Sequence, residues 1–251
     1  MSVELERELD GRVAAVTGSA RNIGAAIAQA LADAGAAVVI NAKSSAADAE
    51  AVARGIRERG GRAVATIADV GTPDGARTLV GSAVASFGRL DILVNNAAAR
   101  REVDFAELGY DEWRDILRTI LDGAYLCAHA ALPHLIAAGG GSIVNIGGLS
   151  SFTGASRRAH VIAAKAGLVG LTRALAHDLS PHGITVNCIA PGLIETARRG
   201  PEPSHHAAHH TLVGRKGTPD DIAALVRFLC GPRARYVTGQ TLHANGGAFM
   251  A

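Results

Sequence analysis

Apolar residues occur along the chain in short runs rich in β-branched side chains, and these runs alternate with longer stretches rich in Ala and Leu. Short apolar runs of this kind are typical of buried strands. The pattern predicts seven strands, over residues 13–17, 37–40, 63–67, 92–95, 142–146, 185–190 and 241–244. Helices are predicted between them. Residues 23–34 and 46–59, for example, each precede a glycine, which readily adopts the left-handed conformation that ends a helix.

The alternation of strands and helices predicts parallel strands joined by right-handed crossovers. We therefore expect a single α/β domain over residues 1–251, built as a Rossmann-like, doubly wound parallel sheet of about seven strands flanked by helices. Ligands of such sheets bind beyond the carboxyl ends of the strands. The segment 197–213 includes the Gly- and Pro-containing run GPEPSHHAAHH and is predicted to form a substrate lid over that site.

Composition narrows the range of partners. The 25 Lys and Arg residues nearly balance the 23 Asp and Glu residues, leaving a formal net charge of +2, so no strong field favours nucleic acid or an anionic membrane. Cys127, Cys188 and Cys230 are scattered, which fits buried thiols in a reducing compartment. The charged N-terminus and the lack of an unbroken apolar run of about 18 residues predict neither signal peptide nor membrane span. We expect a cytoplasmic protein that acts on a small molecule.

A glycine-containing turn joins the first predicted strand to the first predicted helix, in the segment VAAVTGSARNIGAAIA. Gly18 and Gly24 permit a tight turn and close packing of the helix, whose N-terminus then faces a pyrophosphate. Similar turns also occur without any ligand. The segments that follow therefore decide the interpretation.

The loop TGSARNIG resembles the TGxxxGxG loop of the short-chain dehydrogenase/reductase family, and the resemblance extends from about Gly11 to Gly247. Asn22 replaces the middle glycine of that loop, and Ala98 replaces the last residue of the family's NNAG motif. The other segments that match the family, in the same order, are Asp69-Val70, DILVNNAA at 91–98, ITVNCIAPGLIET at 184–196, RKGTPDDIA at 215–223 and YVTGQTLHANGG at 236–247.

The resemblance implies a bound nicotinamide dinucleotide and a set of residues around it. Some of these residues have ordinary alternatives: Asp69 can form a turn, Asn95 and Asn96 can tie strands together, and Thr196 can cap a helix. By resemblance, the cofactor-binding residues are Gly18, Ser19, Arg21, Asn22 and Ile23 in the glycine loop, Lys43 and Ser44 after the second strand, Asp69 and Val70 near the adenine, Asn96, Ala97 and Ala98 along the adenosine ribose, Lys165 on the nicotinamide ribose, and Pro191, Gly192, Ile194 and Thr196 at the nicotinamide amide.

The end of the second predicted strand indicates which dinucleotide is bound. Sites specific for NAD usually place a carboxylate there to accept hydrogen bonds from the ribose hydroxyls. This strand ends VVINAKSS, with no acidic residue, and Lys43, Ser44 and Arg21 can instead meet a 2′-phosphate. The cofactor is therefore predicted to be NADP(H), the alternative being that both cations are ordinary surface residues.

The catalytic residues of the family match this chain at one position in four. The family transfers a hydride between a nicotinamide and a carbonyl/alcohol pair, with a proton from tyrosine and help from serine, lysine and asparagine. In this sequence the serine position is Gly148, the tyrosine position is Val161 and the asparagine position is Ile120, so Lys165 alone remains. Because acid–base assistance commonly contributes ~10²- to 10⁴-fold, ordinary carbonyl reduction is expected to be slow.

Histidines could replace the missing proton donor or bind a metal ion. His160 adjoins Val161 and is a candidate catalytic proton donor, although adjacent helical residues point about 100° apart and a packed histidine is the alternative. His205 and His209, like His206 and His210, have the i,i+4 spacing of a zinc or nickel pair on a helix. No matching Cys or acidic cluster accompanies them, so no metal is predicted.

The sequence thus predicts an NADP(H)-dependent oxidoreductase of the short-chain dehydrogenase/reductase type with an atypical active site. Substrates whose reduction needs no protein acid, such as an activated C=C bond or an iminium, suit it best. A homotetramer or homodimer is expected, with no nucleic acid or membrane partner. Two alternatives stay open: a non-redox enzyme on the same fold, such as an isomerase, dehydratase or cyclase, and a catalytically silent cofactor-binding subunit.

Overall fold

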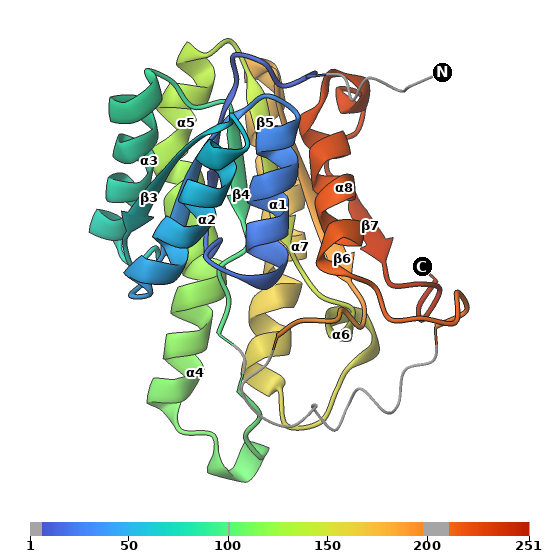
Figure 1. Ribbon diagram of the computed structural model, residues 1–251. Helices are drawn as coiled ribbons and strands as arrows, with labels where there is room; N and C mark the ends of the chain where they lie inside the picture. The colour runs from blue at the N-terminus through green and yellow to red at the C-terminus, as the bar shows by residue number, and fades with distance from the viewer. Residues whose placement is uncertain (1–6, 100, 198–210, 251) are drawn as a thin grey trace.

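The computed structural model describes residues 7–99, 101–197 and 211–250, and these form one seven-stranded parallel sheet in the order β3-β2-β1-β4-β5-β6-β7 (Figure 1). From β1 the chain first adds β2 and β3 on one side of the sheet and then β4 to β7 on the other, which confirms the doubly wound fold. Every predicted strand is present, with ends that differ from the prediction by at most two residues. The strands are β1 (Val13–Val16), β2 (Ala37–Ala42), β3 (Arg62–Ile67), β4 (Ile92–Asn95), β5 (Gly141–Ile146), β6 (Ile184–Pro191) and β7 (Thr241–Ala244).

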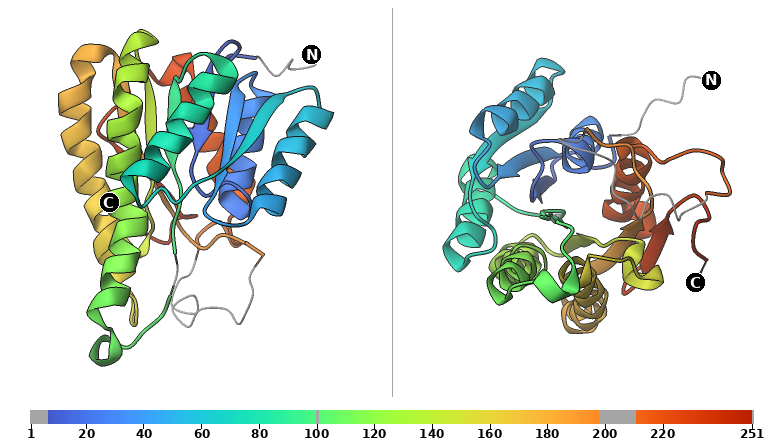
Figure 2. Two further views of the ribbon diagram at one scale, coloured as in Figure 1. Left: turned by 90° about the vertical axis from the view of Figure 1, so that its left-hand side faces the viewer. Right: turned by 90° about the horizontal axis from the view of Figure 1, so that it is seen from below.

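Helices cover both faces of the sheet (Figure 2). One layer holds α1, α2 and α8, and the other holds α3, α5 and α7. The short helix α6 and the helix α4 lie toward the carboxyl edge of the sheet, at the bottom of Figure 1. The helices are α1 (Asn22–Asp33), α2 (Ala46–Glu58), α3 (Pro73–Phe87), α4 (Tyr110–Leu117), α5 (Gly123–Ala137), α6 (Ser150–Thr153), α7 (Ala159–Leu179) and α8 (Pro219–Cys230).

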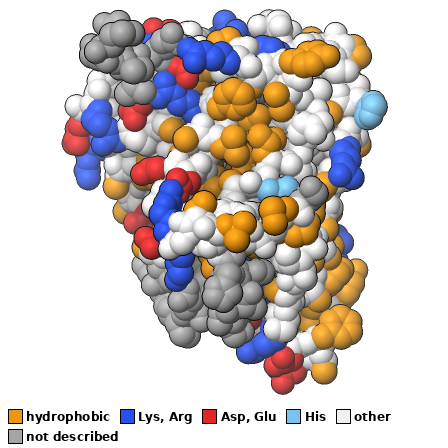
Figure 3. Space-filling model, turned by 90° about the vertical axis from the view of Figure 1, so that its right-hand side faces the viewer, with side chains coloured by type: hydrophobic (Ala, Val, Ile, Leu, Met, Phe, Trp, Pro, Cys, Tyr) orange, Lys and Arg blue, Asp and Glu red, His pale blue; other side chains and the backbone are white. Residues whose placement is uncertain are grey.

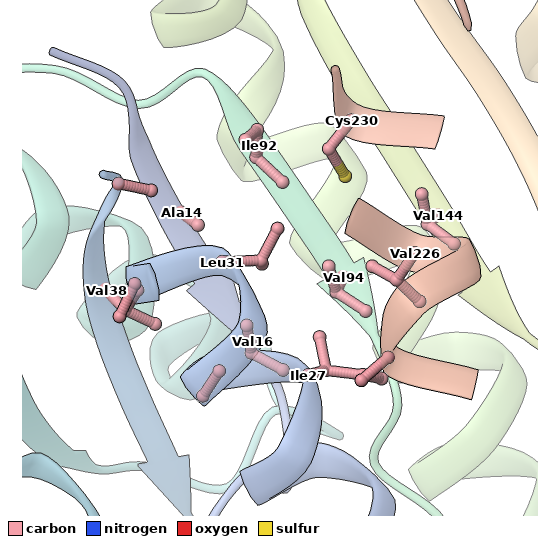
Figure 4. Close-up of a cluster of buried hydrophobic side chains, with 14 of the residues drawn as sticks. Ala14, Val16, Ile27, Leu31, Val38, Ile92, Val94, Val144, Val226 and Cys230 are labelled. Carbon is pink, nitrogen blue, oxygen red and sulfur yellow. The ribbon is translucent and has the colours of Figure 1, made fainter. Parts of the chain in front are cut away.

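The sheet divides the core into two clusters. Ala14 and Val16 of β1 pack into the cluster under α1 and α8, whereas Val13 and Ala15 pack into the cluster under α3 and α5. Figure 4 shows the first cluster, where side chains of α1 and α8 meet those of the central strands. Because both faces are covered, the strands are continuous apolar runs rather than alternating ones. The three cysteines are free and buried, as expected.

The helices α4 and α5 run on from one another through a π-helical segment, Arg118–Asp122. The continuous stretch Tyr110–Ala137 and the stretch Ala159–His182 have the length and hydropathy of membrane-spanning helices. Both, however, supply buried side chains to clusters of this domain, as core helices do. Length and composition therefore do not identify a membrane protein here.

Candidate cofactor and active site

The loop after β1 has two positions that only glycine fits. Gly18 has a φ of +60°, and a Cβ there would stand 2.9 Å from the Cα of Ala97. A Cβ on Gly24 would stand 2.5 Å from the carbonyl oxygen of Gly18. Among the described residues, no side-chain hydrogen bond caps the start of α1 after Arg21. The first backbone N–H groups of α1 are therefore available to an anion at the carboxyl edge of the sheet.

Side chains of the neighbouring strands brace this loop. Asn96 Nδ2 donates to the carbonyl oxygens of Thr17 and Gly18, at 3.0 Å each. Ser19 is fully buried, and its hydroxyl donates to Val16 O and accepts from Asn41 N. The side chains of Ser19 and Asn96 thus hold the loop in place, and their predicted contacts with the cofactor stay a prediction.

Two residues of this brace were not among the predicted site residues. Thr17 Oγ1 accepts hydrogen bonds from the backbone N–H groups of Asn96 and Ala97, at 2.8 and 2.9 Å. Asn41 Oδ1 accepts from Gly18 N at 3.1 Å, although Asn41 belongs to β2. A polar residue inside an otherwise apolar strand, as in VVINA, is the sequence signal that could have identified Asn41.

The ends of β2 and β3 carry a cluster of charges. Lys43 Nζ lies 2.9 Å from Asp69 Oδ2, and Arg118 Nη1 lies 3.5 Å from the same oxygen. Burial acts to raise the pKa of Asp69, but hydrogen bonds from Lys43 and from the Gly71 backbone outweigh it, and the pKa lies below its ordinary value. Asp69 is therefore ionised at neutral pH and holds Lys43 at this edge, where Ser44 and Arg21 are also exposed.

The segment after β6 is fixed by its backbone. Gly192 N donates to Ala244 O at 2.9 Å, and a Cβ on Gly192 would stand 2.7 Å from Asn245 Cα. Ile194 forms a parallel bridge with Gly217. Thr196 is half-buried, and Ala197, which follows it, is hydrogen-bonded to the side chain of Asn22. The predicted phosphate loop and the predicted nicotinamide segment thus lie next to each other.

Lys165 is enclosed on α7, with 9% of its surface exposed. Its Nζ donates to the carbonyl oxygen of Ile146, at the end of β5, at a distance of 2.6 Å. Gly148 follows closely, and a Cβ there would stand 3.4 Å from Lys165 Cδ, an ordinary contact distance. Lys165 is therefore positioned by the strand end, and a side chain at position 148 would lie against its stem.

The tyrosine and asparagine positions are filled by aliphatic side chains of one buried cluster. Val161 and Ile120 are 1% and 2% exposed, and both pack in a cluster with Ile116 of α4 and Leu168 of α7. Ile120 lies within the π-helical segment, a local distortion that is frequent at functional sites. The cluster forms an apolar wall one helical turn before Lys165.

His160 is fully buried at the start of α7. Neither ring nitrogen has a hydrogen-bond partner among the described residues. Burial lowers the pKa of His160 from its ordinary value, so the imidazole is neutral at pH 7. Its proposed role as a proton donor stays a prediction, and packing, the alternative, accounts for its position.

The predicted lid falls mostly outside the described residues, which exclude 198–210 and with them His205, His206, His209 and His210. The lid assignment for 197–213 therefore stays a prediction. Within residues 7–99, 101–197 and 211–250, no group of three or more His, Cys, Asp or Glu side chains could hold a metal ion.

Comparison with known proteins places this fold and site in a family. The family model described as enoyl-(acyl carrier protein) reductase matches residues 18–248. The 3-oxoacyl-[acyl-carrier-protein] reductase FabG of Staphylococcus aureus is 37% identical and matches 94% of this chain and 98% of its own length. The short-chain reductase protein NovJ of Streptomyces niveus is 38% identical, over 94% of this chain and 93% of its own. A short-chain dehydrogenase from Burkholderia cenocepacia, solved in complex with NADP, superposes with a TM-score of 0.90 at 39% identity, covering 96% of this chain and 99% of that one. This chain belongs to the short-chain dehydrogenase/reductase family.

Proposed function

We propose that this chain is an NADP(H)-dependent oxidoreductase whose active site lacks the proton-donating side chains usual in its family. The observation that carries the proposal is the apolar wall before Lys165. Val161 and Ile120 are enclosed in one cluster, and neither side chain can donate a proton or a hydrogen bond. Gly148, at the third position, has no hydroxyl. Cofactor binding and acid catalysis, normally found together, are thus separated in this chain.

The residues present fit a dinucleotide. Gly18 and Gly24 leave no room for a Cβ, so the loop packs closely against Ala97 and against its own backbone. The start of α1 has no side-chain cap and offers its backbone N–H groups to a pyrophosphate. The relative from Burkholderia cenocepacia, which carries NADP, supports the choice of this dinucleotide. Lys43 and Arg21 would hold the 2′-phosphate, and Lys165 the nicotinamide ribose. When bound as NADPH, the cofactor supplies a hydride.

The pair formed by Lys43 and Asp69 refines the choice of cofactor. Lys43 is already oriented by the carboxylate of Asp69, so less side-chain entropy is lost when it meets a phosphate. Part of its charge is offset by the same carboxylate, and Arg118, which contacts that oxygen as well, is itself paired with Asp115 at 2.8 Å. The exposed donors of Lys43 and Arg21 are therefore what favours a dianionic 2′-phosphate over a pair of ribose hydroxyls.

The apolar wall also restricts the substrate. A neutral ketone that receives a hydride becomes an alkoxide, and an unpaired ion in apolar surroundings costs several kcal/mol. An iminium carries its positive charge before the reaction and becomes a neutral amine, so it needs neither a proton nor an oxyanion donor. An activated C=C bond is intermediate, because its negative charge is delocalised. We therefore propose an iminium or an activated alkene as the hydride acceptor.

The test compares two substrates of the same shape. A cyclic N-methyl iminium salt and the ketone of the same ring are supplied with saturating NADPH, and its oxidation is followed by absorbance. The iminium should be reduced at least ~10²-fold faster, since the missing acid affects only the ketone. Ketone reduction as fast as that of the iminium would contradict the atypical site. Turnover without net NADPH consumption would instead favour an isomerase, dehydratase or cyclase, and NADPH binding without turnover of any substrate would favour a silent subunit.

A further inference from the structure

The side chain of Asn22 joins two segments that lie far apart in the sequence. Asn22 Nδ2 donates to the carbonyl oxygen of Ala197 at 3.3 Å, and the backbone N–H of Ala197 donates to Asn22 Oδ1 at 3.0 Å, across a separation of 175 residues. Both ends of the amide are therefore used on one backbone residue. We call this pair of hydrogen bonds the Asn22–Ala197 clasp.

The backbone of Asn22 has a conformation that favours glycine. Its φ is +51°, in the left-handed region, and among the described residues Arg157 is the one other non-glycine residue with a positive φ. Glycine adopts this conformation at no steric cost, whereas Asn tolerates it at some cost. Glycine is also the residue that the family loop TGxxxGxG has at this position. The asparagine thus adds a specific contact at a place where the backbone itself favours no side chain.

The clasp connects the two parts of the cofactor site. Asn22 is the first residue of α1, directly after the glycine loop. Ala197 follows Ile194 and Thr196, and that segment is anchored on its other side by the bonds of Leu193 and Glu195 to Gly217. A dinucleotide that contacted both the loop and residues 191–196 would lie beside the clasp, and the clasp keeps these two segments from separating.

We propose that Asn22 is a positioning residue that holds residues 194–197 against the glycine loop and thereby slows the dissociation of the bound dinucleotide. This inference rests on the proposed function, because it requires that NADP(H) binds between these segments. Asn22 adds no charge to the site, so it acts on the rate of separation rather than on electrostatic attraction. The dissociation rate constant is therefore the quantity that the clasp controls.

The substitution Asn22→Gly removes the clasp alone, because glycine keeps the left-handed backbone. NADPH bound to the full-length protein is displaced by excess NADP⁺ in a stopped-flow fluorimeter. The loss of two exposed hydrogen bonds corresponds to an increase in dissociation rate of about 5- to 30-fold. The association rate should change by less than about twofold, since no charge is altered. In the cofactor-free protein, hydrogen exchange of the Ala197 amide should also become faster.

Ala197→Gly is the matched control. Ala197 contributes only backbone groups to the clasp, so this variant retains both hydrogen bonds and should release NADPH at a rate close to that of the wild type. An Asn22→Gly variant that binds NADPH and releases it no faster than the wild type would overturn the clasp and leave the proposed function standing. A wild type that binds no NADPH would overturn both.

Discussion

Restoring the three missing side chains should convert this chain into a carbonyl reductase. The triple variant Val161→Tyr, Gly148→Ser and Ile120→Asn should reduce simple ketones about 10²- to 10⁴-fold faster than the wild type, which is the usual contribution of acid–base assistance. Lys165 is already in place, with its ammonium bonded to Ile146 O, so the restored phenol would stand one helical turn from it.

The structure sets the cost of this change. Val161 and Ile120 are almost fully buried in the same cluster, so a phenol at position 161 alone overpacks the wall, at a cost of about 1–3 kcal/mol in the free energy of unfolding. Asparagine in place of Ile120 removes volume from that cluster and offsets part of the strain. At position 148 a Cβ meets Lys165 Cδ at 3.4 Å, so the Cβ of a serine fits there. The triple variant should therefore fold.

The assay is NADPH oxidation with a cyclic ketone, at matched saturation with cofactor. The single Val161→Tyr variant should gain less than the triple variant, because residues of a catalytic unit do not act additively. A second triple variant with Val161→Phe supplies the ring without the hydroxyl and should stay at the wild-type rate. If the wild type already matches the Val161→Tyr triple variant, the reasoning is refuted, a proton donor must exist elsewhere, and His160→Ala is the variant to make next.

Three further predictions follow from other parts of the structure. In a fluorescence titration, Lys43→Ala should weaken NADPH binding about fivefold and leave NADH binding unchanged, because an exposed charge-assisted contact contributes little more than about 1 kcal/mol. An equal loss of affinity for both cofactors would contradict the assignment of Lys43 to the 2′-phosphate. His160→Leu should raise the free energy of unfolding by about 1–3 kcal/mol at pH 7.5, since it removes unsatisfied buried nitrogens. Because burial lowers the pKa of His160, the unfolded chain binds the proton more readily than the folded protein, and the wild type should lose stability as the pH falls below the ordinary value of 6.5. The stability advantage of His160→Leu should therefore be larger at pH 5 than at pH 7.5 in urea titrations. The same difference at both pH values would show that His160 titrates normally. Hydrophobic side chains gather on the face that carries α8 and the edge strand β7 (Figure 3), so we propose that copies associate there, and Phe228→Asp should lower the molecular mass measured by light scattering.

The fold could be predicted from sequence because each strand is buried on both faces and appears as an apolar run. Val13–Val16 and Ile92–Asn95 are examples, and their pairing order follows from the βαβ alternation. The glycine loop was also predictable, since Gly18 and Gly24 are required by backbone approaches that no other residue permits. The strands and the glycine loop depend on local composition and on the order of elements along the chain, and both can be read from the sequence.

Other features depend on contacts that leave no local mark. The clasp from Asn22 to Ala197 joins residues 175 apart, and no pattern around Asn22 points to its partner. Ser19 was assigned to the cofactor from its place in the loop, but its hydroxyl is hydrogen-bonded to backbone groups of β1 and β2, Val16 O and Asn41 N. His160 is fully buried at the start of α7, and no pattern in its neighbours along the sequence indicates this.

The π-helical segment Arg118–Asp122 also affects how the chain responds to a deletion. Hydrogen bonds of a π-helix span one residue more than those of an α-helix, so the run from α4 to α5 holds one residue more than a regular helix with the same number of turns. Removing one residue from this segment would return it to an α-helical turn and leave α4 near its present orientation, with Ile116 still in the cluster that it shares with Val161. A single-codon deletion should therefore be tolerated better here than elsewhere in α4 or α5, and it would change which side chain stands in the place of Ile120.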